Sequence, residues 1–238
     1  MQRIVTVTAL LLLSWSALAQ AKPKLAIIID DLGYDMMPRE VAALPPQVSV
    51  SVIPFTEFDT AVALSALSQH REVLLHLPMQ SPDGTPQEPG ALTLAMTQDD
   101  ISHAIREALY RVPQAVAVNN HMGSLLTEKE QPMHWVMAEL KAHQLGFIDS
   151  RTTPKTVAQR IAKAHGLATN RRHVFLDHIQ TRAFIDQQIS LAVRQAKRRG
   201  IAVVIAHPFP VTLQTLQEAL PHLQDEVELV PVSLALKH

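Results

Sequence analysis

Short apolar runs alternate with amphipathic stretches along most of the chain. Strands that are apolar on both faces are typical of a parallel sheet covered by helices. The repeated β-α order indicates one α/β domain, built as a closed or nearly closed barrel or as an open doubly wound sheet. The predicted strands are 25–29, 48–52, 73–76, 115–119, 147–149, 174–176, 201–205 and 228–233.

Helical periodicity fills the segments between these runs. Thr56 and Asp59 have the spacing of a capping box, as do Thr97 and Asp100, so we expect a helix to begin after each pair. A further helix is expected near 213–223. Three others are predicted to end at a C′ glycine: 129–145 before Gly146, 156–165 before Gly166, and 184–199 before Gly200.

Polar side chains follow six of the apolar runs, where ordinary strands end in turn residues such as Gly, Asn or Ser. The carboxyl ends of parallel strands meet at one rim, which is where α/β folds build active sites. We therefore expect these side chains to gather at that rim. They are Asp30 and Asp31, His76, Asn120 and His121, Asp149 and Arg151, Asp177 and His178, and His207.

The composition narrows the chemistry that this rim can perform. The 238 residues carry a formal net charge of −1, which gives no indication of a nucleic-acid partner. The absence of cysteine excludes thiolate ligands and Cys nucleophiles, so a metal would be held by His, Asp, Glu or neutral donors. No GxGxxG or GxxxxGK[ST] string supports a nucleotide-phosphate site. The Pro- and Gly-containing segment 80–97 is expected to be a long surface loop beside a strand end.

The first 21 residues have the pattern of a signal peptide. Arg3 precedes an apolar stretch over 4–13, and A-x-A-like sites occur at 17–19 and 19–21. The stretch is shorter than the ~20 apolar residues of a membrane span. We expect cleavage, export to the periplasm, and a single mature domain over 22–238 without a stable membrane span. An uncleaved N-terminal anchor is the alternative.

Asp30 and Asp31 are adjacent carboxylates after a buried strand, and their like charges raise the pKa of at least one of them. One would bind a cation while the other acts as a base; the alternative is an Asx turn. Asp31, His76 and His121 together would supply two imidazoles and a carboxylate to Zn²⁺ or a similar ion, leaving positions open for water. Because these ligands come from separate strands, their spacing does not test the set.

His207 follows the most β-like run of the chain and would protonate a leaving amine; the alternative is a rim histidine bonded to a backbone carbonyl. Asp149 and Arg151 are expected to form an ion pair at the rim or to orient His207. Asp177 and His178 are expected to be a further supporting pair.

Six motifs in this order resemble the divergent polysaccharide deacetylase (YibQ-like) family, over residues 23–235. This family in turn resembles a remote branch of the NodB-type carbohydrate esterases. The resemblance implies a distorted (β/α) barrel of about seven strands and a divalent metal. The motifs are IIIDDLGYD, LLHLPMQ, VNNHMGS, FIDSRTT, VFLDH and IAHPFP.

The NodB pattern implies roles for individual residues. Its paired aspartates correspond to Asp30, the base, and Asp31, a metal ligand. Its H-[ST]-x-x-H motif retains His76, but Gln80 stands where the second ligand would be. Either His121 replaces that ligand or the metal site is weakened. The closing L-x-H motif corresponds to Ile205-Ala206-His207 and implies a general acid.

The resemblance therefore predicts an exported, zinc-dependent hydrolase that removes acetyl groups from a cell-envelope glycan, with peptidoglycan-related material as one substrate to consider. Asn120, Gln80 and the pairs after the later strands would support the metal or the substrate. The alternative is a non-catalytic glycan-binding or envelope-assembly module on a degenerate deacetylase scaffold, which Gln80 favours.

Overall fold

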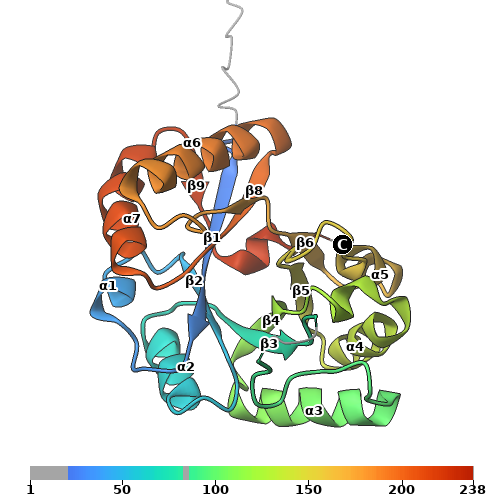
Figure 1. The fold of residues 1–238 in the computed structure, drawn as a ribbon. Coiled ribbons are helices and arrows are strands. Elements are labelled where there is room, and N and C mark those ends of the chain that lie inside the picture. The colour runs from blue at the N-terminus through green and yellow to red at the C-terminus, as the bar shows by residue number, and fades with distance from the viewer. Residues whose placement is uncertain (1–20, 83–85, 238) are drawn as a thin grey trace, which may run out of the picture.

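The computed structural model describes residues 21–82 and 86–237, which form a curled parallel sheet with helices around it (Figure 1). The strand order is β6-β5-β4-β3-β2-β1-β8-β7, and β9 pairs with the start of β1. The strands are β1 Lys24–Leu32, β2 Ser49–Val52, β3 Val73–Met79, β4 Ala115–Met122, β5 Gly146–Asp149, β6 Thr169–Arg171, β7 Val174–Phe175, β8 Ile201–Ala206 and β9 Glu228–Leu229.

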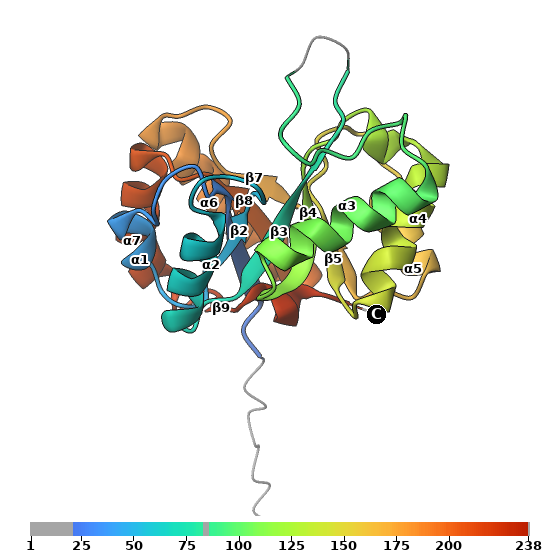
Figure 2. The ribbon, with the colours of Figure 1, turned by 90° about the horizontal axis from the view of Figure 1, so that it is seen from below.

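The helices lie outside the curled sheet (Figure 2). They are α1 Arg39–Ala42, α2 Asp59–Ser68, α3 Gln98–Arg111, α4 Glu130–Ala142, α5 Ala158–Ala164, α6 Arg182–Arg199 and α7 Pro210–Leu223, with 3₁₀ turns η1 Leu126–Glu128 and η2 Val232–Ala235. The predicted distorted (β/α) barrel is confirmed, with eight strands along the main order where about seven were expected.

The short link between β6 and β7, residues 172–173, closes the barrel. Among the described residues, the two end strands β6 and β7 are not paired with each other. The short link between them is anchored to both sides, since Arg172 N donates to Asp149 O (2.9 Å) and His173 N donates to Val203 O (2.8 Å). The link joins the β5 side of the sheet to β8, so the strand ends form a nearly complete ring.

Strand alternation separates an inner from an outer core. On β1, Leu25, Ile27 and Ile29 pack against the helices, whereas Ala26 and Ile28 face the barrel interior. The interior is small, filled by short and branched side chains, and lined on one side by Val232 and Ala235 of η2. Successive strand residues point to opposite faces. Every second residue of a strand therefore forms one inward-facing row, and the buried apolar residues at the start of the strand determine which residues belong to that row.

Two local predictions are wrong. Thr56 does not cap α2: its hydroxyl donates to Ile53 O (2.7 Å), and the Asp59 carboxylate instead accepts bonds from the backbone N–H groups of Phe55 and Thr60. Gly146 is not a C′ residue but the first residue of β5. A Cβ there would lie 2.4 Å from a Leu236 methyl carbon, so close packing explains this glycine.

The remaining differences concern short elements. The predicted strand 228–233 is shorter, because residues 232–235 turn into η2, and β6 and α1 were not predicted. The capping box of Thr97 and Asp100 is confirmed. Gly166 and Gly200 follow their helices with φ of 75° and 78°, as a C′ glycine does.

The described parts of the segment between β3 and α3, residues 80–82 and 86–97, form the expected loop and project from the body of the molecule in Figure 2. Its later part returns to the end of β3, where Leu92 N donates to Pro78 O (2.9 Å) and Gln80 N donates to Leu92 O (2.8 Å). Of the predicted signal peptide, residues 1–20 lie outside the described residues. Within the described part of the chain, no helix has the length and apolar character needed to cross a bilayer.

Candidate active site

The inward rows of the strands end in polar side chains at the carboxyl edge of the sheet. On β1 the row of Ala26 and Ile28 continues to Asp30, which is 2% exposed. On β3 Leu74 is followed by His76 in the same way. On β4 the row of Ala117 continues to Asn119 and His121, and β3 and β4 are in register at His76 and Asn119. The apolar barrel interior thus forms the floor of a polar site.

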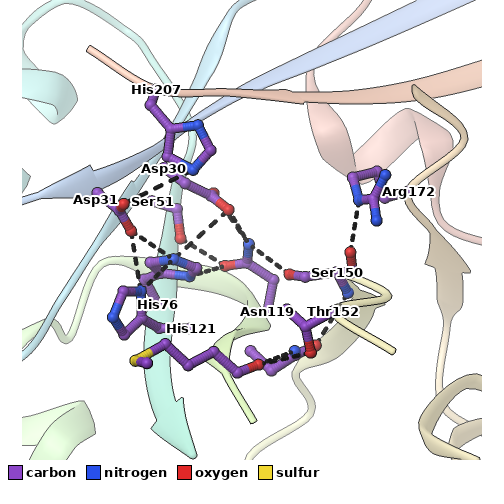
Figure 3. Close-up of polar contacts among 12 residues, drawn as sticks. Asp30, Asp31, Ser51, His76, Asn119, His121, Ser150, Thr152, Arg172 and His207 are labelled. Carbon is purple, nitrogen blue, oxygen red and sulfur yellow. Dashed lines mark hydrogen bonds and ion pairs between the residues drawn. The ribbon is translucent and has the colours of Figure 1, made fainter. Parts of the chain in front are cut away.

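Asp31 reaches the same site because the strand breaks there. Regular alternation would turn its side chain away from that of Asp30. Instead Asp31 has φ of 59°, and the pairing of β1 with β2 shifts register between Ile29 and Leu32. Such irregularities commonly redirect side chains beside active sites. Two adjacent carboxylates therefore face one cavity (Figure 3).

Three potential ligand atoms converge beside these carboxylates. Asp31 Oδ1 lies 3.1 Å from His76 Nε2 and 3.0 Å from His121 Nδ1, and the two ring nitrogens are 3.2 Å apart. In a tetrahedral zinc site with bonds of ~2.0–2.1 Å, neighbouring ligand atoms lie ~3.3 Å apart. The three side chains therefore fit a divalent cation in both separation and donor type.

The hydrogen bonds around His76 fix its ring for this role. Asn119 Nδ2 donates to both carboxylate oxygens of Asp30 at 3.0 Å, so Asn119 Oδ1 faces Ser51 and His76. An amide oxygen only accepts, so the proton in the 3.1 Å contact belongs to His76 Nδ1. Nε2 is then the ring nitrogen that faces Asp31 and would bind a metal.

The electrostatic balance of the two aspartates differs. Burial raises the pKa of Asp30 and outweighs the opposing effects of His76 and His207. Burial also acts to raise the pKa of Asp31, but the contacts with His121 and His76 lower it well below its usual range. Asp31 is therefore the permanent anion of the cluster, whereas Asp30 is the carboxylate that binds a proton more readily.

His207 lies on the other side of the aspartates from His76 and His121 in Figure 3, with its Nε2 3.7 Å from Asp31 Oδ2. Its Nδ1 is 2.9 Å from Asp177 Oδ1, and its backbone N–H donates to Asp177 Oδ2 (2.7 Å). Burial lowers the pKa of His207, but the bond to Asp177 and the nearby carboxylates outweigh it and raise that pKa. Asp177 thus orients the ring and directs Nε2 into the cavity.

The cavity above these groups measures about 400 Å³ and includes residues that the sequence did not single out. Arg172 lies at one side, where Nε and Nη2 donate to the backbone carbonyls of Ser150 (2.6 Å) and Arg151 (2.7 Å). Phe175 packs edge-on against His207 with ring centroids 5.1 Å apart. The most important residue that the sequence patterns did not single out is Asn119. It lies two residues before His121 on β4, and strand alternation would have placed both on the same face.

The other predicted residues divide between the cavity and its support. Asn120 and Arg151 line the cavity. The Asp149 carboxylate does not contact His207; it accepts bonds from Arg151 N, Thr156 and Gln159 N and so orders the segment after β5.

Gln80 and His178 lie away from the ligand cluster. Gln80 Oε1 accepts from Leu94 N (2.7 Å), which holds the loop between β3 and α3. His178 is exposed and stacks on Phe175. Gln80 therefore stabilises the loop between β3 and α3. His121 supplies the third side chain of the ligand cluster.

Comparisons with known proteins agree with this architecture. Residues 27–236 match the model of the family described as divergent polysaccharide deacetylase. The chain is 39% identical over 236 residues to the uncharacterized protein YibQ of Escherichia coli, covering 99% of this chain and 73% of that protein. It is 37% identical over 217 residues to an uncharacterized protein of Haemophilus influenzae, covering 91% and 78% respectively.

A solved structure also shares the fold. An uncharacterized protein from Agrobacterium tumefaciens superposes with a TM-score of 0.83 at 21% identity, covering 91% of this chain and 90% of that one. At this identity the likeness establishes the arrangement of elements and leaves the chemistry to the side chains described above.

Proposed function

The chain belongs to the divergent polysaccharide deacetylase family, and on that premise we propose that it is a metal-dependent hydrolase removing acetyl groups from a cell-envelope glycan. The observation that carries the proposal is the convergence of Asp31 Oδ1, His76 Nε2 and His121 Nδ1 within 3.0–3.2 Å of one another. The A-x-A-like sites near residue 19 and the apolar stretch before them support export to the periplasm.

Asp31, His76 and His121 would hold the ion, with Zn²⁺ favoured by two imidazoles and one carboxylate. A divalent cation in such a site supplies Lewis acidity, which polarises a carbonyl and makes water more acidic. The protein's contribution is to fix the ligands. Asn119 sets the ring of His76, and the break in β1 turns the Asp31 carboxylate toward both rings.

Asp30 would act as the general base. Its carboxylate is buried, is held by the Asn119 amide, and lies 3.5 Å from His76 Nε2. Burial raises its pKa, which strengthens it as a proton acceptor. When water adds to the acetyl carbon, Asp30 receives the proton that the water loses.

His207 would act as the general acid when the C–N or C–O bond of the acetyl group breaks. Its Nδ1 proton is donated to Asp177, and its raised pKa favours the protonated ring. Nε2 then transfers its proton to the departing amine or alkoxide, leaving acetate and the deacetylated sugar. The acid and base thus flank the ligand cluster.

Acetate release from acetylated glycans by the metal-loaded protein tests this function. We expect turnover that falls by at least ~10²-fold in Asp30→Asn and His207→Ala, the usual effect of removing a general base or acid. His134→Ala is the matched control, since His134 pairs with His165 outside the site. Absence of metal-dependent acetate release from every glycan tested would contradict the proposal.

The alternative function is a glycan-binding module without turnover. Measuring the metal content of the same proteins distinguishes it from a hydrolase. A hydrolase requires a near-stoichiometric ion that is lost in His76→Ala and retained in His134→Ala. Tight glycan binding by metal-free protein, with no acetate released after metal is added, would favour the module.

A further inference from the structure

A strongly basic set of cavities adjoins the catalytic cavity at the point where the barrel closes. A cavity of about 580 Å³ is lined by Lys163, Arg171, Arg199 and Lys237, together with His173. A smaller one of about 150 Å³ shares Arg171, His173 and Arg199 and adds two further arginines. We call the six cationic residues the basic groove: Arg151, Lys163, Arg171, Arg172, Arg199 and Lys237.

The charge of the basic groove is only partly balanced by nearby carboxylates, since Asp149 and Asp30 act on Arg172 without forming an ion pair with it. No Asp or Glu is among the described residues that line either cavity, and none of the six cations forms an ion pair with a described carboxylate. Some exposed cations elsewhere are paired, such as Arg182 with Glu218 at 2.5 Å and Lys197 with Glu226 at 2.6 Å. Since the whole chain has a net charge of −1, the excess is local.

The pKa of His173 reflects the same local excess of positive charge. Burial lowers its pKa, and the charges of Arg199, Arg171 and Lys237 lower it further, to about 4. The neutral ring has a structural use, since its Nδ1 accepts a bond from Val203 N (2.9 Å). A neutral histidine beside several unpaired cations indicates a region that favours bound anions.

The groove is connected to the active site through shared residues. Arg151 and Arg172 line the smaller basic cavity and also the catalytic cavity. The connection follows from the fold, because Arg171, Arg172 and His173 belong to the end of β6 and to the link that closes the barrel. A chain with its acetyl group at the metal cluster would therefore have its neighbouring groups beside cations.

We propose that the basic groove binds carboxylate or phosphate groups of the glycan whose acetyl group enters the catalytic cavity, so that the substrate is an anionic glycan. The identification of the ligand as a glycan rests on the proposed function. A cavity of about 580 Å³ has the size of ligand sites in proteins, and guanidinium groups bind planar or tetrahedral oxyanions in a forked geometry.

The test measures binding of three fluorescently labelled tetramers of N-acetylglucosamine by anisotropy: neutral, carboxylate-bearing and phosphate-bearing. We expect at least one anionic tetramer to bind ~10-fold or more tightly than the neutral one at low salt, with the advantage shrinking as salt screens it. The two anionic tetramers separate carboxylate from phosphate as the preferred group.

Two double variants make the test specific. Arg171→Gln with Arg199→Gln should abolish the anionic preference. Arg194→Gln with Arg198→Gln removes the same charge from α6, outside the lining of both cavities, and should retain it. If the first pair does not fold, Lys163→Gln with Lys237→Gln replaces it, since both lysines are exposed.

Equal affinity for neutral and anionic tetramers would overturn the proposal, as would an equal loss of preference in the control pair. Binding requires no turnover, so the two proposals fail separately. An anionic preference without acetate release from any glycan retains the groove and removes the deacetylase. Acetate release with no anionic preference retains the deacetylase and removes the groove.

Discussion

Asn119 connects the base to the ligand cluster. Its amide nitrogen donates to Asp30, and its oxygen accepts from His76 and from Ser51 (2.5 Å). The sequence patterns indicated Asn120 and left Asn119 out, although Asn119 alternates with His121 and so shares its face of β4. That its amide joins Asp30 to His76 depends on tertiary structure, because these residues come from three strands.

Replacing Asn119 should weaken metal binding without removing a ligand. In Asn119→Ala we expect metal affinity to fall ~10–100-fold, since the ring of His76 loses the partner that fixes its orientation. Metal titration by competition with a chelator measures this. Asn170→Ala is the control, because Asn170 is buried but bonds to Ala235 O away from the site. Equal losses in both variants would assign Asn119 to stability alone.

The bond from His207 to Asp177 should set the alkaline limb of activity. The raised pKa of His207 keeps the ring protonated, and activity is lost as the pH rises through that pKa. In Asp177→Asn the supporting charge is gone, so the pKa falls and the alkaline limb of kcat moves to lower pH, with a lower maximum. An unchanged limb would show that His207 does not donate the proton.

At the scale of elements, the strands were predictable and their breaks were not. Apolar runs located the strand ends and hence the rim. Asp31, Met122 and Arg151 lie at or near the ends of β1, β4 and β5 with φ between 52° and 59°, and each turns the chain beside the site. Such conformations are uncommon for non-glycine residues and are imposed by surrounding contacts, which the local sequence does not contain.

Gly123 at the end of β4 tests how closely these breaks are packed. It has φ of 84°, and a Cβ there would lie 2.7 Å from Met79 Cβ. Gly166 has φ of 75° with nothing within 4 Å of an added Cβ, so Gly166→Ala should lose only the backbone contribution, ~1 kcal/mol. Gly123→Ala should cost ~1–3 kcal/mol more through the clash.

Urea unfolding of both glycine variants measures the difference, with metal titration beside it. Because Gly123 follows His121 by two residues, we expect weaker metal binding in Gly123→Ala and normal binding in Gly166→Ala. Equal unfolding free energies in the two variants would show that the chain accommodates a Cβ at Gly123 without strain.

At the scale of the whole molecule, the order of elements predicted the barrel and the location of the rim. It did not predict that the link between β6 and β7 closes the barrel. β6 has three residues, which is too short for an apolar pattern to be recognised, whereas β7 lies within the predicted strand 174–176. The basic groove depends on that closure. Its cations come from the segment after β5, α5, β6, the link, α6 and the C-terminal segment, so only the tertiary structure brings them together.

Metal binding should stabilise the entire fold, since the three ligands come from β1, β3 and β4. A ligand at 100 times its Kd stabilises the folded state by ~2.7 kcal/mol. We therefore expect the melting temperature to rise by several degrees on adding Zn²⁺ to metal-free protein, and to stay unchanged in His76→Ala. An equal rise in both proteins would place the effect at another site.

The most direct measurement is anomalous diffraction from crystals of the metal-loaded protein. We predict one peak within ~2.0–2.2 Å of Asp31 Oδ1, His76 Nε2 and His121 Nδ1, with Asp30 and His207 flanking it. No peak among these atoms at saturating metal, or a peak held by other side chains, would contradict the assignment of this rim as a metal-dependent active site.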